Sequence, residues 1–576
     1  MNLFSILTDT STRKVFFSLL FGIIAGVGFA LLIPLVTNSF TNNDGFEVLS
    51  QAEHTFFSLA VTRYKFAELF LFTCLVVLIA RTTSQVLLTW VVIEATSKLR
   101  KRYYQAIFRT PLIMLEKVGY ARLITSITTD VQRIVSGAQR LPDILISSVT
   151  LIGMLLFLMY LSTEIFYFVV AAIAFGAISF QIPVLLGRRF FLRSRDKVEH
   201  LQEAIKGSVY GIKELKLCKT RRDNYLLEEL ISTENEVLKA TKIGATIMRG
   251  ALNYGDMIIF FVIGYVAFII SNYHAITQQQ ILGSIMVLLY ITGPISILMS
   301  AIPELVQANI SVKKANKLFA DLPAEKINHE LAALPNWHNL SFKNVTFNYA
   351  TNQDINESEN GELERAFAVG PLSFELNKGE VAFIVGGNGS GKSTLSKLIT
   401  GHYLPTDGLI SLDQCEIDAH RITGFRDQVS AVYSDYYLFT RLLGGGDSQD
   451  ENKISRYLKL LQLEDKVSLS AGKFSSLSLS DGQRKRLALL VSFLEDKQLY
   501  LFDEWAADQD PIFKDIFYTA ILPDLKAKKK LVVVISHDDR YFHVADKMLV
   551  MEQGKLVEPK EQIETKKPPV LRAALV

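Results

Sequence analysis

Cysteine is scarce in this chain of 576 residues, and the three cysteines, Cys74, Cys218 and Cys415, lie far apart. Their spacing matches neither a metal-binding nor a redox motif, so we interpret them as packing residues in reducing or lipid surroundings. Net charge is also small, at +3. A charge so nearly balanced gives no argument for nucleic acid as a partner, and we expect none.

Two further patterns are missing. The N-terminal segment MNLFSILTDTSTRK is not followed by the small-residue cleavage site of a secretory signal, so we expect the first apolar run to be retained. The HRD and DFG motifs of protein kinases are also absent, which excludes that class of phosphoryl-transfer enzyme.

Apolar residues, by contrast, are abundant: 49% of the chain is hydrophobic and the mean hydropathy is +0.24. This is too apolar for a wholly soluble protein, and the chain is long enough for two or more domains. Crossing ~30 Å of hydrocarbon takes about 20 helical residues, and helices satisfy their own backbone in lipid. The sequence therefore predicts an all-α, six-helix transmembrane domain with spans at Val15–Thr37, Phe66–Val92, Pro142–Leu161, Ile165–Leu186, Gly250–Ser271 and Ile281–Pro303.

The charges between the apolar runs orient them. The loops after the second and fourth runs are long and rich in Lys and Arg, whereas residues 162–164 and 272–280 contain neither. By the positive-inside rule, both termini and the two long loops are cytoplasmic. These loops also carry apolar residues at helical spacing, so we expect the membrane helices to continue well into the cytoplasm.

Two features of the membrane half allow more than one interpretation. The first outer loop, about residues 38–64, mixes acidic and aromatic residues; it could be a lid over an outer gate or a passive amphipathic turn, and we favour the turn. Arg81 lies inside the second run, where a charge is costly unless it faces a wet cavity, pairs with a neighbour or reaches the interface. We name Arg81 as the candidate for the cargo cavity.

The second half contains a glycine-rich segment, Gly386–Thr394, which reads GGNGSGKST and fits G-x-x-x-x-G-K-[ST]. The apolar run VAFIV precedes it and LSKLIT follows with helical spacing, which is the strand, loop and helix context that the motif requires. Such a loop turns backbone N–H groups around a β-phosphate at a helix N-terminus. Lys392 would reach the β- and γ-phosphates and Ser393 would hold Mg²⁺. The motif predicts an α/β P-loop ATPase domain that uses ATP and Mg²⁺.

A second segment, LYLFDEW, places Asp503 and Glu504 at the end of an apolar strand. Acidic pairs are common, but one at this distance after a phosphate loop is strong evidence. Asp503 would hold Mg²⁺ through water and Glu504 would polarise the attacking water, because phosphoryl transfer needs mainly positioning and charge stabilisation from the protein.

Between these segments lies LSDGQRKRLALL, in which Ser480 and Gly482 precede a helix rich in Arg and Leu. This is a second helix N-terminus suited to an anion. A single domain needs only one such site to bind one γ-phosphate, whereas two copies facing head to tail would use both. The pattern therefore predicts a homodimer.

The ATPase half begins at about Trp337, after a charged connection. The alternating run LSFKNVTFNY fits a strand that ends at Tyr349, whose ring could stack on adenine. Residues 351–365 are polar and acidic, and we expect a solvated insertion without chemistry. The predicted division is a transmembrane domain over 1–309, a linker over 310–336 and a nucleotide-binding domain over 337–576.

Together, the phosphate loop, LSDGQ, LFDE and His537 in VVVISHDD resemble the ATPase domain of ABC transporters, and the six spans ahead of them resemble a half-size exporter that acts as a homodimer. More narrowly, LSDGQRKRLALL, DEWAADQDP, LPDLK and ISHDDRYFHVAD are similar to bacterial exporters of cyclic peptides and peptide siderophores, of the pyoverdine and syringomycin type. The resemblance covers essentially the whole chain. It implies ATP-driven export of a cyclic or nonribosomal peptide or siderophore precursor across the bacterial inner membrane, by alternating access.

The resemblance also implies residue roles. Glu504 is the general base and His537 the γ-phosphate sensor; Ser393 and Asp503 belong to the metal site, and Asp510 bridges the two halves. The full ATP-binding set expected from it is Tyr349, Gly386, Gly387, Asn388, Gly389, Ser390, Gly391, Lys392, Ser393, Thr394, Ser434, Asp435, Leu479, Ser480, Asp481, Gly482, Gln483 and Asp510.

The sequence departs from the family pattern at two places. Asp481 stands where many relatives carry Gly, although Gly482 still permits close backbone approach. In FRDQVSAVYSDYYLF, Ser434 stands where ABC proteins usually place a glutamine that senses Mg²⁺ and the membrane domain. Gln428 lies too early to substitute, so Ser434 or Asp435 takes that role, and coupling through this loop is in doubt.

Two cytoplasmic segments, Leu115–Val131 and Gly211–Leu230, resemble those that carry coupling helices; basic helices near anionic lipid are the alternative. The expected partners are a second copy, membrane lipid, a peptide-like substrate and a periplasmic accessory protein. Two rival functions remain open: an exporter of lipid or hydrophobic drug, and an ATP-dependent sensor or regulatory subunit that moves nothing.

Overall fold

The computed structural model describes residues 2–39, 53–56, 59–270, 277–327, 334, 336–349, 367–443 and 451–558. The chain divides into two compact units. The membrane unit comprises Met1–Gln105 and Tyr120–Asp321, and the ATPase unit comprises Ala106–Gly119 and Leu322–Val576. The predicted acidic insertion at 351–365 lies outside the described residues.

In the membrane unit, six helices of the described part are long and apolar enough to cross a membrane, which confirms the prediction of six such helices. Short π-helical turns interrupt the helices at Ser126–Asp130, Tyr225–Ile231 and Val266–Ile270. The helices are α1 (Leu3–Ser39), α2 (Arg63–Arg109), α4 (Tyr120–Thr125), α5 (Val131–Gln139), α6 (Leu141–Leu161), α7 (Thr163–Tyr210), α8 (Ile212–Leu217), α9 (Lys219–Asn224), α10 (Ser232–Tyr265) and α12 (Gln278–Asp321).

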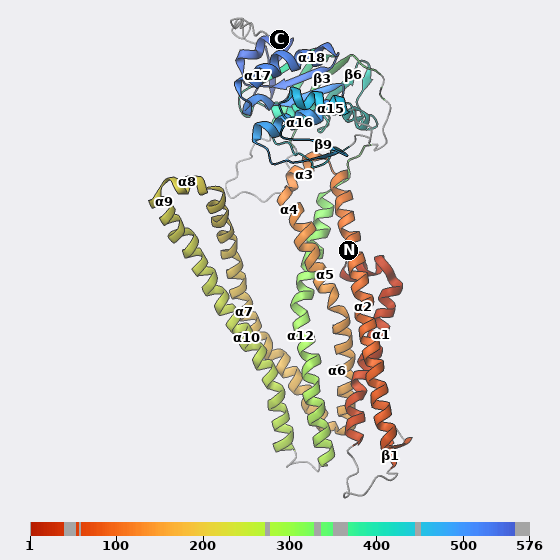
Figure 1. Cartoon of the computed structure of the whole chain (residues 1–576). Coiled ribbons are helices and arrows are strands. Elements are labelled where there is room, and N and C mark those ends of the chain that lie inside the picture. The colour runs from red at the N-terminus through yellow and green to blue at the C-terminus, as the bar shows by residue number, and fades with distance from the viewer. Residues whose placement is uncertain are drawn as a thin grey trace. The chain divides into compact units, whose positions relative to one another are not determined.

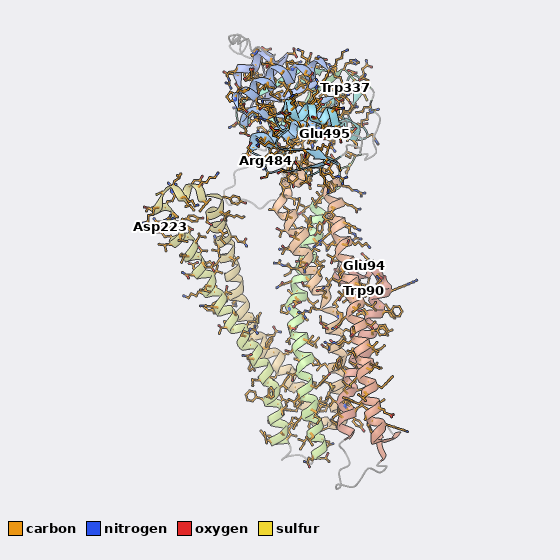
Figure 2. All side chains as sticks on the ribbon, in the orientation of Figure 1. Trp90, Glu94, Asp223, Trp337, Arg484 and Glu495 are labelled. Atoms are coloured by element: carbon orange, nitrogen blue, oxygen red, sulfur yellow. The ribbon has the colours of Figure 1, made fainter. Side chains whose placement is uncertain are left out.

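The long helices α7 and α10 lie side by side and carry α8 and α9 at one tip (Figure 1). Asp223, on α9, marks this tip in Figure 2. Helix α7 continues to Tyr210, well past its apolar run. That such extensions lie in the cytoplasm stays a prediction. Near its other end the pair packs against α6 and α12 through buried residues such as Met154, Val169 and Leu288.

Two parts of the membrane unit differ from expectation. In the first outer loop, the strands β1 (Glu53–Phe56) and β2 (Leu59–Thr62) pair antiparallel, which we did not predict. Residues 310–321, which we assigned to the linker from the sequence, continue helix α12 and belong to the membrane unit. The lysines of residues 310–321 occupy an exposed face of the helix, while Val312, Ala315 and Leu318 recur at helical spacing and are buried.

In the described part of the ATPase unit, a six-stranded sheet has the order β14-β13-β5-β12-β11-β8, and a four-stranded sheet has the order β4-β3-β6-β7. Strands β13, β5, β12, β11 and β8 are parallel neighbours, and β14 is antiparallel at the edge. The strands are β3 (Asn339–Asn348), β4 (Ala368–Asn377), β5 (Val381–Gly386), β6 (Asp407–Leu412), β7 (Cys415–Glu416), β8 (Val429–Val432), β9 (Leu469–Ser470), β10 (Lys473–Phe474), β11 (Leu499–Asp503), β12 (Leu531–Ile535), β13 (Lys547–Glu552) and β14 (Lys555–Val557). The helices are α3 (Leu112–Val118), α13 (Lys392–Ile399), α14 (Ile422–Arg426), α15 (Glu451–Leu460), α16 (Asp481–Glu495), α17 (Pro511–Ile516) and α18 (Leu522–Ala527), with short turns at Trp505–Asp508, Phe517–Ile521 and Asp539–Val544.

The central strands are apolar along their whole length because both faces of the sheet are covered. In β5, Ala382 and Ile384 belong to one hydrophobic core, whereas Phe383 belongs to the other. The same alternation holds in β11, where Leu501 and Phe502 face opposite cores. This alternation fixes the register of the paired strands, and it thereby fixes where the loops that follow them begin.

Candidate nucleotide-binding site

The parallel register places four loops at one edge of the sheet. Phe502 pairs with Val432 and Val534, and Ile535 pairs with Ile384, so β5, β8, β11 and β12 end side by side. Ligands of open α/β sheets bind outside these carboxyl ends. The segments concerned are the phosphate loop after β5, the segment at Ser434 after β8, the acidic pair at the end of β11 and His537 after β12.

The phosphate loop has the conformation that its glycines predict. Gly391, at the N-cap of α13, has φ of 103°, and Gly389 has φ of 75°. The Lys392 ammonium donates to the backbone carbonyls of Gly386 and Gly387 at 3.0 and 2.9 Å. Lys392 is buried, so its charge is held beside the loop by backbone oxygens. The arrangement leaves an exposed loop before a helix N-terminus, which is suited to phosphate.

Replacing Gly391 with alanine should lower the free energy of unfolding by about 1–2 kcal/mol, because a left-handed backbone is costly for a residue with a Cβ. The new Cβ would also meet Val369 Cγ2 at 3.1 Å and Met551 Cε at 3.2 Å, which would displace the loop. We expect the thermal shift caused by ATP to disappear. Gly472→Ala is the matched control, since Gly472 has φ of 70° but open space around it. An equal ATP shift in both variants would contradict the prediction.

The acidic pair and the histidine lie together. Glu504 Oε1 is 3.1 Å from His537 Nε2, and both side chains are partly exposed. Asp503 is buried, and burial, with the nearby Glu504 carboxylate, raises the pKa of Asp503. A backbone hydrogen bond from Ser434 and the charge of Lys392 oppose this rise. The site thus combines one shielded and one accessible carboxylate.

The segment after β8 joins the site through Ser434, whose backbone N–H favours the charged form of Asp503. A cavity of about 430 Å³ lies between this segment and the start of α16, lined by residues that include Asp435, Arg484 and Asp508. Gln428 is committed elsewhere, because its Oε1 accepts from Trp337 Nε1 at 2.5 Å. This agrees with the interpretation that Gln428 does not replace the missing glutamine.

The N-terminus of α16 is a capping box. Ser480 Oγ accepts from the Gln483 backbone at 3.3 Å, and Gln483 Oε1 accepts from the Ser480 backbone at 3.1 Å. Ser480 and Asp481 are exposed. In the described part of the chain, no hydrogen bond or ion pair joins this N-terminus to the phosphate loop.

Asp510 and Tyr349 also have defined surroundings. Asp510 caps α17 by accepting from the Phe513 backbone at 2.9 Å, and it pairs with Arg486 at 2.5 Å. The Tyr349 hydroxyl is 2.9 Å from Thr394 Oγ1, so Tyr349 lies beside the phosphate loop. Leu479, next to the capping box, packs against the hydrophobic core that contains Phe383 and Phe502.

One residue of this region was missed. Lys485 is buried, donates to the Glu504 carbonyl at 3.2 Å and pairs with Asp508 at 2.8 Å, while Trp505 Nε1 donates to the Lys485 carbonyl. It fastens α16 to the backbone of Glu504. The signal that could have indicated its burial is its spacing of four residues from the apolar Leu489, which is buried.

The membrane unit contains a cavity of about 230 Å³ between α6, α7, α10 and α12. Its described lining is almost wholly apolar, and among those residues Thr292 and Ser296 are polar. Arg81 does not line it; its guanidinium lies 5.7 Å from the ring centre of Phe29. The proposed cavity role of Arg81 stays a prediction.

Comparisons with known proteins agree with this geometry. Residues 369–507 match the ABC transporter family model. The ATP-binding protein SyrD of Pseudomonas syringae pv. syringae is 31% identical over 94% of this chain and 93% of its own length. An ATP-dependent lipid A-core flippase of Alcanivorax borkumensis is 22% identical over 82% of this chain and 81% of its own. A bacterial Atm1-family ABC exporter with ATP bound shares the fold, with a TM-score of 0.69, 17% identity and coverage of 96 and 95% of the two chains.

Six apolar helices joined to a P-loop ATPase define a membrane transporter driven by ATP hydrolysis. The chain belongs to the ABC transporter family, as an exporter half-transporter with one membrane domain and one ATPase domain.

Proposed function

We propose that the protein exports a cyclic or nonribosomal peptide, or a siderophore precursor, across the bacterial inner membrane. The observation that carries this proposal is the similarity to SyrD over nearly the whole chain, together with the motifs that resemble exporters of such peptides. Half-transporters of this family act as dimers, and the exposed capping box of α16 supports a homodimer of this chain.

The ATPase cycle follows from the residues at the sheet edge. Glu504 would orient and deprotonate the attacking water, and His537, whose Nε2 is 3.1 Å from Glu504 Oε1, would contact the γ-phosphate. The oxygens of Ser393 and Asp503 suit Mg²⁺, which takes one or two protein oxygens plus phosphates rather than a cage of carboxylates. Bound there, Mg²⁺ would neutralise charge on the phosphates. ATP drives the cycle because it binds the closed pair better than the open one.

The orientation proposal rests on the loop charges. Both termini and the ATPase unit lie in the cytoplasm, and the outer loops face the periplasm, where an accessory protein collects the cargo. Membrane lipid surrounds the spans, which is consistent with the exposed apolar side chains of α2, such as Leu71 and Leu78.

Export is tested with inside-out vesicles that carry the full chain and a candidate cyclic peptide. The wild type should accumulate peptide with ATP, whereas Glu504→Gln should not, because hydrolysis drives the return to the inward state. If both proteins moved equal amounts of every cargo tried, the chain would be a sensor or regulatory subunit rather than a transporter.

A lipid or hydrophobic drug is the alternative cargo, and two observations favour it: the largely apolar cavity of about 230 Å³ and the similarity to a lipid A-core flippase. ATPase stimulation in nanodiscs separates the two. Stimulation by peptide at constant lipid composition supports the peptide cargo, and stimulation by lipid with none by peptide supports the alternative.

A further inference from the structure

Helix α3 folds as part of the ATPase unit, although the chain reaches it directly from α2. Leu112 and Ile113 pack against one core of the central sheet. On the same helix the Glu116 carboxylate makes two polar contacts with the ATPase unit. Lys397 Nζ donates to Glu116 Oε1 at 2.7 Å, and the Tyr403 hydroxyl donates to Glu116 Oε2 at 2.5 Å.

These contacts are partly shielded from water. The Glu116 and Lys397 side chains are 31 and 23% exposed, and Tyr403 is buried. Burial, followed by the hydrogen bond to Glu116, raises the pKa of Tyr403, so its hydroxyl remains a donor. Lys397 also lies 5.1 Å from the ring centre of Tyr403. A carboxylate with two such donors is a stronger tie than an exposed ion pair.

Both donors belong to elements that border the nucleotide site. Lys397 is on α13, the helix that begins at the phosphate loop. Tyr403 lies edge-to-face with Tyr349, with ring centres 6.1 Å apart and an angle of 83°. Tyr349 in turn contacts Thr394 of the phosphate loop at 2.9 Å. A continuous set of contacts therefore runs from the expected adenine side of the site to α3.

A second route to the membrane helices matters in this chain because Ser434 occupies the position of the usual glutamine. A serine hydroxyl is shorter than a glutamine amide and reaches fewer partners. We infer that Glu116 is a positioning residue that couples the adenine side of the site to α3 through Tyr403 and Lys397. The inference rests on ATP binding, not on the identity of the cargo.

The test measures hydrogen exchange of the α3 amides in the full chain in nanodiscs, in a Glu504→Gln background that holds ATP. ATP with Mg²⁺ should slow exchange of residues 106–119 by roughly tenfold, the factor that a hydrogen bond to a charged group supplies. Tripolyphosphate with Mg²⁺ fills the phosphate loop without an adenine, and we expect it to slow α3 exchange less than ATP does.

Glu116→Gln and Tyr403→Phe should each remove the ATP-dependent slowing, while retained binding of a fluorescent ATP analogue shows that the site is intact. Because both act at one contact, the double variant should add no further change. Asp427→Asn, which breaks an exposed pair with Lys497 at 3.1 Å, is the matched control and should behave as the parent protein.

Three results would overturn the inference: equal slowing by tripolyphosphate and ATP, unchanged slowing in Tyr403→Phe, or no effect of ATP on α3 in the parent. Tyr403→Phe keeps the aromatic packing and so remains informative if Glu116→Gln fails to fold. None of these results bears on peptide export, which the vesicle assay decides separately.

Discussion

Glu504→Gln is expected to reduce the turnover of ATP by about 10²–10⁴-fold, the range that a positioned general base supplies. The amide has the same shape as the carboxylate but cannot accept the proton of the attacking water. Glu504 Oε1 lies 3.1 Å from His537 Nε2, and the side chain is 40% exposed, so the substitution leaves no buried cavity. Phosphate release gives the turnover, and calorimetric titration with ATP should show that binding persists.

The control for this variant is Asp524→Asn, which removes a carboxylate paired with Lys528 at 2.6 Å on the surface of α18. It changes the same charge away from the sheet edge and should leave turnover unaffected. If Glu504→Gln retained turnover within about tenfold of the wild type, its loss would fall below the range of general-base catalysis and another group would have to activate the water.

The elements of the site could be predicted because each is local in the chain. The strand, loop and helix around Lys392 occupy consecutive residues, and the acidic pair ends an apolar strand. The meeting of Glu504 and His537 follows from the parallel pairing of β11 with β12. Such residues can be recognised from the pattern of their neighbours in the chain, so the site residues of the ATPase half could be predicted from the sequence.

What escaped prediction depends on long-range contacts. Glu116 and Lys397 are separated by 281 positions, and nothing in either segment indicates that they pair. The helical continuation of α12 was hidden because Lys313, Lys314 and Lys317 suggested a charged connection, whereas Val312 and Leu318 give it a buried stripe. Lys485 lies in a basic segment of the sequence, and only the fold shows that it is buried and donates to the Glu504 carbonyl.

The second large effect concerns the assembly of the site from two chains. Lys392→Ala removes the ammonium from the phosphate loop. Ser480→Asp keeps a good N-cap for α16 but places a carboxylate where the partner's phosphate should lie. Each change should lower ATP turnover of its homodimer at least about tenfold, since each removes or opposes a charge contact with phosphate.

Mixed dimers then distinguish a site that is built from two chains from a site that is built within one chain. In a dimer of one Lys392→Ala chain and one Ser480→Asp chain, both changes fall in the same composite site, and the other site is intact. We expect such tandem-purified dimers to regain substantial ATP turnover. A dimer of wild type with the chain that carries both changes has one defect in each site and should remain inactive. The reverse ranking would mean that each chain completes its own site, because only then does the wild-type chain keep an undamaged centre.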